Sequence, residues 1–158
     1  ANNANDIFYN YLLSGIYSPK ASIQTIANAM DVGDPSNFAR ILDLYKSSHA
    51  EICNHISGAT YSDDEIAATM KKCYEQTGYV LDPHGAGGYQ ALKDNLKEGE
   101  TGVFLETAHP AKFKEKVDAI LSTDIEIPTR LADFMKGKKQ SLEMAADFSA
   151  FKQFLLSV

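Results

Sequence analysis

The sequence predicts a helix-rich α/β fold that contains part of a parallel sheet, and three observations predict it. Apolar residues recur at helical spacing along most of the 158 residues. Two short apolar segments, 79–82 and 103–105, flank one of these helical stretches, which is the pattern of a βαβ unit with parallel strands and a right-handed crossover. Proline opens and glycine closes several of the predicted helices.

The first sixty residues are predicted to contain three helices. Apolar spacing predicts a helix over 7–14 that stops at Gly15. A second helix is expected after Pro19, because the residues that follow carry an apolar stripe of Ile23, Ile26, Ala27 and Met30. Ser36 is expected to cap a third helix, whose buried stripe would be Phe38, Ile41, Leu42 and Tyr45. Residues 49–60 remain ambiguous.

The middle of the chain is predicted to hold two longer helices. Ser62 and Glu65 have the spacing of a capping box, in which the two residues satisfy orphan N–H groups of a helix start. The helix that follows is predicted to end at Gly78 and to bury Ile66, Met70, Cys73 and Tyr74. Pro83 begins the next helix, which runs towards Leu96 and forms the crossover between the two predicted strands.

Three helices are predicted in the last third of the chain. The first begins near Pro110 and buries Phe113, Val117, Ile120 and Leu121. The second begins at Pro128, and Asp147 is expected to cap the third. The third carries an apolar stripe of Phe148, Phe151, Phe154 and Leu155 and is expected to dock on the body of the protein.

Composition excludes several classes of function. With 44% apolar residues, the chain is long enough for one domain with its own core. A formal charge of −6 argues against a nucleic-acid surface. No apolar run approaches the ~20 residues that a membrane span requires. Cys53 and Cys73 are expected to be reduced thiols of a soluble cytoplasmic protein.

The stretch from Gly102 to Lys114 carries the clearest functional signal. An apolar run ends in Thr107, and Pro110 then opens a helix. In α/β proteins, ligands bind at the carboxyl ends of strands, where helix N-termini offer N–H groups to anions. His109 and Lys112 flank that helix start, so they are candidates to contact a phosphate or carboxylate. The residues alone favour a capping threonine, a turn histidine and a solvated lysine.

This stretch, together with Ser18-Pro19-Lys20-Ala21 and Asn28-Ala29-Met30-Asp31-Val32, resembles the carboxyl-terminal part of threonine synthase. That family uses pyridoxal 5'-phosphate and has a tryptophan synthase β-like fold. The resemblance covers nearly the whole chain. It implies that residues 1–158 are a single carboxyl-terminal portion of the cofactor-binding large domain, without the N-terminal part that bears the Schiff-base lysine and the glycine-rich phosphate loop.

The resemblance implies a reaction and a role for Thr107. Threonine synthases convert O-phospho-L-homoserine and water to L-threonine and phosphate. Thr107 would face the pyridine nitrogen of the cofactor with a neutral hydroxyl, which cannot hold a proton on that nitrogen as a carboxylate would. No catalytic residue is expected within the chain, so the chain alone is expected to be inactive and to need the missing N-terminal part as its partner.

The resemblance also indicates four further substrate-binding candidates upstream. They are Asn5, Asp6, Lys20 and Asp31. Structural roles are open as well, because Asn5 and Asp6 would cap the first helix and Asp31 would bind a loop amide.

Other interpretations of the sequence remain open. Gly85 to Gly88 would let a backbone approach a ligand or a packed helix, and no catalytic role is assigned to His84. His49 and Cys53 share a predicted helical face, but the chain lacks a compact zinc-binding pattern. The chain could instead belong to another pyridoxal-phosphate lyase or dehydratase, or be a non-catalytic helical binding module. Its two unpaired strands would then favour self-association.

Overall fold

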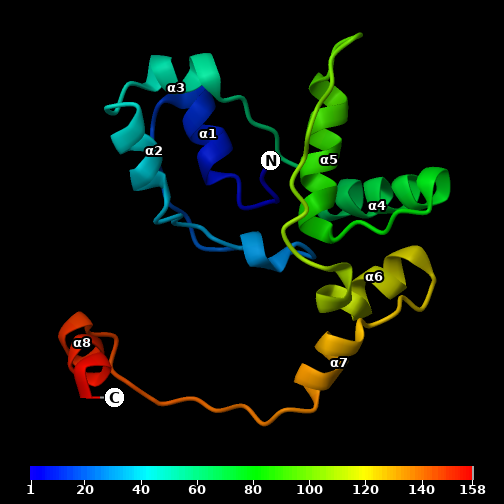
Figure 1. Cartoon of the computed structure of the whole chain (residues 1–158). Helices are drawn as coiled ribbons and strands as arrows, with labels where there is room; N and C mark the ends of the chain where they lie inside the picture. The colour runs from blue at the N-terminus through cyan, green and yellow to red at the C-terminus, as the bar shows by residue number, and fades with distance from the viewer. Residues whose placement is uncertain (158) are drawn as a thin grey trace. The chain divides into compact units, whose positions relative to one another are not determined.

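The computed structural model describes residues 1–157. The chain divides into two compact units, Ala1–Glu126 and Ile127–Val158. Helices account for all the regular structure of the described residues (Figure 1). The first unit contains α1 (Ile7–Ser14), η1 (Asn28–Met30), α2 (Phe38–Leu44), α3 (His49–His55), α4 (Asp63–Thr77), α5 (Pro83–Asn95), η2 (Pro110–Phe113) and α6 (Lys114–Leu121). The second contains α7 (Thr129–Met135) and α8 (Phe148–Ser157).

Several predicted helix ends are confirmed. α1 ends at Gly15, whose φ of 72° is the left-handed conformation that glycine adopts without strain. α4 begins with the capping box of Ser62 and Glu65 and ends at Gly78, which also has a positive φ. Asp147 accepts a hydrogen bond from the N–H of Ala150 at the start of α8. These ends depend on local chemistry, which explains why the sequence predicts them.

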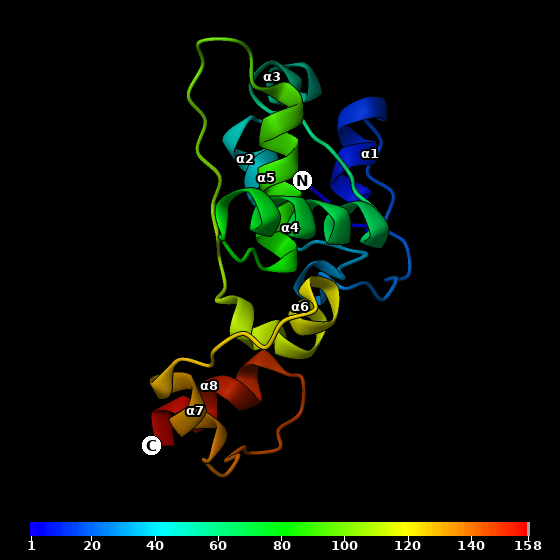
Figure 2. The same ribbon diagram turned by 90° about the vertical axis from the view of Figure 1, so that its right-hand side faces the viewer.

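The larger core of the first unit joins α4, α5 and α6. Its buried members are Ala27, Ile66, Met70, Cys73, Leu81, Ala86 and Val117. Figures 1 and 2 show α4 crossing the amino-terminal half of α5. A smaller core joins α1, α2 and α3 through Tyr11, Phe38 and Ile52. Tyr11 and Phe38 meet edge to face, with ring centroids 4.6 Å apart.

The helix predicted after Pro19 does not form, and this expectation was wrong. Residues 19–27 have no helical turn, and η1 is a single short turn. The reason is that the side chain of Asn5 binds both the N–H and the C=O of Ile23, at 2.7 and 2.8 Å. Asp31 likewise accepts from the N–H of Thr25 at 3.0 Å. These long-range bonds occupy the backbone groups that a helix would pair.

Ser36 does not cap α2, which was also a wrong expectation. The N-cap of α2 is Asn37, and its side chain makes no capping bond. The helix begins instead where Phe38 enters the smaller core. Residues 49–55 of the ambiguous stretch form α3, whose N-cap Ser48 accepts from the N–H of Glu51.

The predicted parallel sheet is not observed among residues 1–157. The helix-rich character is confirmed, but segments 79–82 and 103–105 form no strand, and the bridge between Asn2 and Thr60 is isolated. The segments are linked through a side chain, because the N–H of Asp82 donates to the Oε1 of Glu106 at 2.7 Å. A parallel strand pair needs backbone groups facing each other, and here the backbone donor is taken by a carboxylate.

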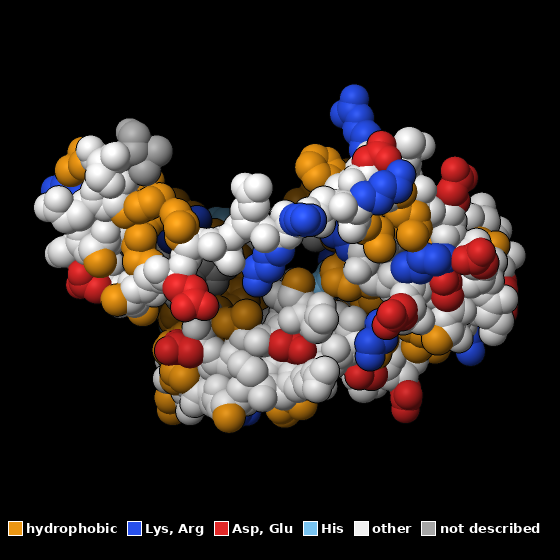
Figure 3. All heavy atoms as spheres, turned by 90° about the horizontal axis from the view of Figure 1, so that it is seen from below, with side chains coloured by type: hydrophobic (Ala, Val, Ile, Leu, Met, Phe, Trp, Pro, Cys, Tyr) orange, Lys and Arg blue, Asp and Glu red, His pale blue; other side chains and the backbone are white. Residues whose placement is uncertain are grey.

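The second unit leaves much of its apolar surface exposed. Phe134 of α7 is 82% exposed and Phe148 of α8 is 76% exposed. No described helix of the chain is long and apolar enough to cross a membrane. Cys53 and Cys73 are both free thiols. Figure 3 shows apolar, acidic and basic side chains scattered over the visible face.

Candidate functional site

The segment that carries Thr107 runs along α5 as an extended stretch (Figure 1). Its side chains alternate, so that Phe104 and Glu106 are half-buried while Val103, Leu105 and Thr107 are exposed. The ring of Phe104 packs edge to face against Tyr89 of α5, with centroids 5.4 Å apart. This contact, and the bond from Asp82 to Glu106, place Thr107 beside the first turns of α5.

Thr107 lines a pocket of about 470 Å³ that we call the Thr107 pocket. Its walls come from η1, the start of α5, the extended segment and η2, and they include Ala29, Met30, His84, Gly88, Leu105, Ala108, Lys112 and Phe113. The side chains are therefore mostly apolar, with one hydroxyl, one imidazole and one ammonium group. That composition is typical of a small-molecule or cofactor site.

His109 and Lys112 have different relations to this pocket. His109 is the N-cap of η2, and its Nδ1 accepts from the N–H of Ala111 at 3.1 Å. This bond uses one ring nitrogen for capping, as the turn interpretation expected. Lys112 is exposed and lines the pocket. Of the two, Lys112 is thus the residue whose charge is available to an anion there.

His84, which lines the Thr107 pocket, belongs to a largely buried polar cluster that we call the Asp82 cluster: Asp82, His84 and Glu106. The Nδ1 of His84 lies 2.5 Å from the Oδ1 of Asp82, and the two side chains are 8% and 0% exposed. The Nε2 of His84 accepts from the N–H of Ala29 at 3.1 Å. The remaining oxygens, Oδ2 of Asp82 and Oε2 of Glu106, are buried without a hydrogen-bond partner.

Burial and hydrogen bonds shift both carboxyl groups. Burial would raise the pKa of Asp82, but hydrogen bonds with His84 and Glu106 outweigh it and lower that pKa. Burial raises the pKa of Glu106 to about 7; the side chain and charge of Asp82 raise it further, against the lowering effect of the bond from the backbone N–H of Asp82. A protonated Glu106 gains an O–H donor, which an ionised carboxylate lacks. Asp82 therefore carries the charge.

Asn5 and Asp31 lie together, but inside a structural network. Asn3 and Asn5 are buried, and the Nδ2 of each donates to the Oδ1 of Asp31, at 2.9 and 3.1 Å. Thr25 also donates to that carboxylate, through its hydroxyl at 2.7 Å. These bonds leave Asp31 engaged with the loop, which is the role that the structural interpretation gave it.

Asp6 and Lys20 form a separate exposed pair. Lys20 Nζ lies 3.4 Å from Asp6 Oδ1, and the lysine side chain is 57% exposed. Asp6 is the N-cap of α1 but makes no side-chain capping bond. Both residues line a pocket of about 190 Å³ that does not include Thr107.

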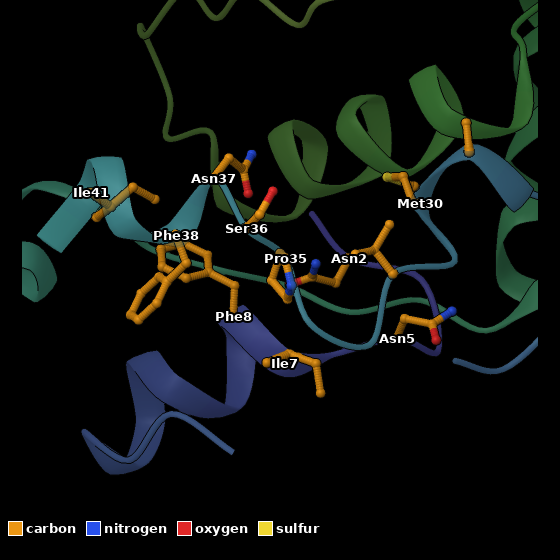
Figure 4. Close-up of a pocket in the computed structure, with 12 residues that line it drawn as sticks. Asn2, Asn5, Ile7, Phe8, Met30, Pro35, Ser36, Asn37, Phe38 and Ile41 are labelled. Carbon is orange, nitrogen blue, oxygen red and sulfur yellow. The ribbon is translucent and has the colours of Figure 1, made fainter. Parts of the chain in front are cut away.

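A larger pocket of about 530 Å³ lies between the two cores (Figure 4). Phe8 of α1 and Phe38 and Ile41 of α2 form its apolar side, and Asn2, Asn5, Ser36 and Asn37 contribute polar groups. Ala29 and Met30 both line this pocket and the Thr107 pocket. The short η1 turn therefore forms a wall of both.

His49 and Cys53 share a face of α3, as their spacing predicts, with Sγ and Nε2 3.3 Å apart. Both side chains lie at the carboxyl end of α1, where Nε2 is 3.0 Å from the carbonyl oxygen of Leu12. They act there as side-chain caps for carbonyl groups that lack a helical partner. The described residues contain no group of three or more potential metal ligands.

The sequence interpretation did not assign a site role to Glu106 or to the histidine of Asp82-Pro83-His84. Glu106 directly precedes Thr107, and in an extended segment it therefore faces the opposite side. That alternation was the available signal, since a carboxylate on the inward face of a half-buried segment needs a partner.

Comparison with known proteins shows which proteins the chain is similar to. A family model described as "Threonine synthase, C-terminal" matches residues 85–155. Threonine synthase from Haemophilus influenzae is 44% identical over 154 residues, which are 98% of this chain and 36% of that protein. The chain therefore matches the carboxyl-terminal part of threonine synthase. This confirms the resemblance that the Thr107 segment carries.

Further threonine synthases agree over the whole chain. The protein from Escherichia coli K12 is 39% identical over 157 residues, covering 99% of this chain and 36% of its own length. The crystal structure of threonine synthase from Escherichia coli superimposes with a TM-score of 0.82 over 99% of this chain and 36% of that one, at 38% identity. The chain spans about a third of the length of these threonine synthases.

A second solved threonine synthase, from Brucella melitensis, is described as bound to pyridoxal phosphate. It superimposes with a TM-score of 0.79 at 27% identity, over 98% of this chain and 39% of that chain. Nearly the whole chain thus superimposes on part of two solved threonine synthases.

Proposed function

We propose that this chain forms the carboxyl-terminal part of a threonine synthase, which converts O-phospho-L-homoserine and water to L-threonine and phosphate with pyridoxal 5'-phosphate. The observation that carries the proposal is the position of Thr107 in a partly apolar pocket, within a chain whose full length is similar to threonine synthases. The same similarity favours this reaction over that of a lyase with another leaving group.

The residues of the Thr107 pocket fit the cofactor ring. Thr107 offers an exposed hydroxyl, and the described residues form no hydrogen bond with it, so it is available to a ring nitrogen. Leu105, Met30 and Phe113 offer apolar surface to the faces of a ring. When bound, pyridoxal phosphate supplies an electron-withdrawing ring that stabilises negative charge on the substrate. In this proposal, Thr107 orients that ring and leaves its nitrogen without a full proton charge.

The remaining candidates are proposed to act either by direct contact with the substrate or indirectly, by holding a loop or turn. Lys112 provides positive charge for the substrate phosphate or carboxylate, and His109 caps the first turn of η2, on which Lys112 lies. Asp6 and Lys20 are proposed as exposed contacts to the substrate or to the loops that cover it. Asn5 and Asp31 act indirectly, by holding the loop over 19–33.

The rest of the active site is proposed to lie in an N-terminal part of the same enzyme. Residues 1–158 would be a single portion of the cofactor-binding large domain, and strands of the N-terminal part would pair with segments 79–82 and 103–105 to complete the parallel sheet. The Schiff-base lysine would lie in that part, so the chain alone would be inactive. The two free thiols are consistent with a cytoplasmic location.

The test is a matched pair of substitutions in the complete gene product. Thr107→Val removes the hydroxyl and preserves the side-chain shape, whereas Thr107→Ser keeps the hydroxyl. We expect the valine variant to lose phosphate release from O-phospho-L-homoserine by about 100-fold and the serine variant to stay within about tenfold of the unsubstituted enzyme. Equal activity in the two variants would exclude a role for the hydroxyl.

A further inference from the structure

We propose that His84 is a positioning residue that fixes the η1 turn as a wall of the Thr107 pocket. The catalytic consequence of this inference rests on the proposed function, but the structural linkage does not. His84 joins three elements: Asp82 at the start of α5, Ala29 in η1 and Phe113 in η2.

The first step in the argument is the protonation pattern of the imidazole. Asp82 is fully buried and its Oδ1 is 2.5 Å from the Nδ1 of His84, so Nδ1 carries the hydrogen and donates it. The Nε2 accepts the N–H of Ala29 at 3.1 Å, so Nε2 carries a lone pair. A ring with one donor and one acceptor is neutral, and Asp82 selects the Nδ1–H tautomer.

The second step is what this ring holds in place. The N–H of Ala29 has its partner in His84, and Ala29 and Met30 line both the Thr107 pocket and the larger pocket of Figure 4. On its other side the ring packs against Phe113, with centroids 4.7 Å apart. A shift of the ring would therefore move η1 and η2, which are two walls of the same pocket.

The third step connects His84 to Thr107 through the Asp82 cluster. Asp82 accepts from the N–H and the ring of His84, and its own N–H donates to Glu106 at 2.7 Å. Glu106 directly precedes Thr107 in the chain. The carboxylate of Asp82 therefore holds the ring of His84, and the backbone N–H of the same residue holds the segment that carries Thr107, so Asp82 links η1 to that segment.

Nitrogen NMR tests the protonation pattern on the unsubstituted full chain. With ¹⁵N-labelled histidine at pH 8, we expect His84 to show a protonated Nδ1 and an unprotonated Nε2. Comparison with the His84→Gln variant assigns the signal among the four histidines. A protonated Nε2, or the mixture of tautomers found in a free imidazole, would overturn the proposal.

Two substitutions separate a positioning role of the His84 side chain from a role that depends only on its volume. In His84→Gln the amide oxygen reaches the position of Nε2 and can accept the N–H of Ala29. In His84→Asn the amide nitrogen reaches the position of Nδ1, so the bond to Asp82 remains and the bond to Ala29 is lost. We expect the Ala29 amide to exchange with solvent at least about tenfold faster in the asparagine variant than in the glutamine variant. Equal exchange would contradict the linkage.

The kinetic test uses the same pair in the complete gene product. Because a displaced η1 loosens the pocket before chemistry begins, the asparagine variant should raise KM for O-phospho-L-homoserine by about tenfold with kcat changed by less than about threefold. The glutamine variant should restore KM. Equal loss in both variants would show that His84 only fills space. If the unsubstituted enzyme releases no phosphate, the proposed function fails, while the NMR and exchange results still decide the role of His84.

Discussion

The backbone N–H of Asp82 donates to the side chain of Glu106 at 2.7 Å, across the helix that separates them in the sequence. This bond joins the segment before α5 to the segment that carries Thr107. It brings two carboxyl groups together in a buried place, and their remaining oxygens face no donor unless one of them is protonated. Stability and site geometry are therefore linked at this point.

Glu106 should make the stability of the chain depend on pH. Burial raises its pKa from an ordinary 4.5 to about 7, so the folded chain holds a proton between these values that the unfolded chain has lost. Linkage then requires the free energy of unfolding to fall as pH rises from about 4.5 through 7. Thermal unfolding across pH 5 to 8 measures this fall. In Glu106→Gln the fall should be absent, and an unchanged pH profile in that variant would contradict the assignment.

Gly85 should not tolerate a side chain. A Cβ at this position would overlap the Oε2 of Glu106, whereas a Cβ at Gly87 would have its nearest neighbour at 3.8 Å. We expect Gly85→Ala to lower the free energy of unfolding by about 1–3 kcal/mol. Gly87→Ala, as the matched control in the same helix, should raise it by up to about 1 kcal/mol through helix propensity.

A double substitution tests the stated cause. Adding Glu106→Ala to Gly85→Ala removes the atom with which the new Cβ would overlap. The effects of the two substitutions on the free energy of unfolding, measured by urea denaturation, should therefore not be additive. Additive effects would mean that the cost of Gly85→Ala comes from elsewhere.

Asn5 should be needed for folding of the loop over 19–33. Asn5→Ala removes partners of the N–H and C=O of Ile23, which leaves partly buried backbone groups unpaired and should cost about 1–3 kcal/mol. Its neighbour Asp6 is the control, because its pair with Lys20 is exposed and Asp6→Ala should cost less than about 1 kcal/mol. A larger cost for Asp6→Ala would reverse the roles assigned to these neighbours.

The extended segment should make the isolated chain associate. Val103 and Leu105 are 82% and 77% exposed and lie on the same face of an unpaired segment. We expect light scattering to show oligomers at high concentration, and the variant Val103→Thr with Leu105→Lys to be monomeric. Oligomers that persist in this variant would place the contact elsewhere.

Local chemistry explains which elements the sequence could predict. The ends of α1 and α4 depend on Gly15, on Gly78 and on a capping box, and each of these acts within one turn of its helix. The sequence also predicts the apolar stripe of α4, because Ile66, Met70 and Cys73 recur at helical spacing. In the structure these three residues are buried together.

Long-range contacts explain what the sequence could not predict. The stripe after Pro19 has helical spacing, but Asn5 and Asp31 bind its backbone from positions that no local pattern connects. The segment 103–105 has the composition of a strand, yet a strand needs backbone partners, and the described residues supply none. The roles of Asp82 and Glu106 also depend on contacts across 24 residues.

The measurement that tests the central claim most directly is phosphate release from O-phospho-L-homoserine by the complete gene product, with added pyridoxal phosphate, compared with the 158-residue chain alone. The account predicts cofactor-dependent phosphate and L-threonine from the complete product and none from the chain. Two results would contradict the account. One is phosphate release by the 158-residue chain alone. The other is a complete product that is inactive on O-phospho-L-homoserine but active on a substrate with another leaving group.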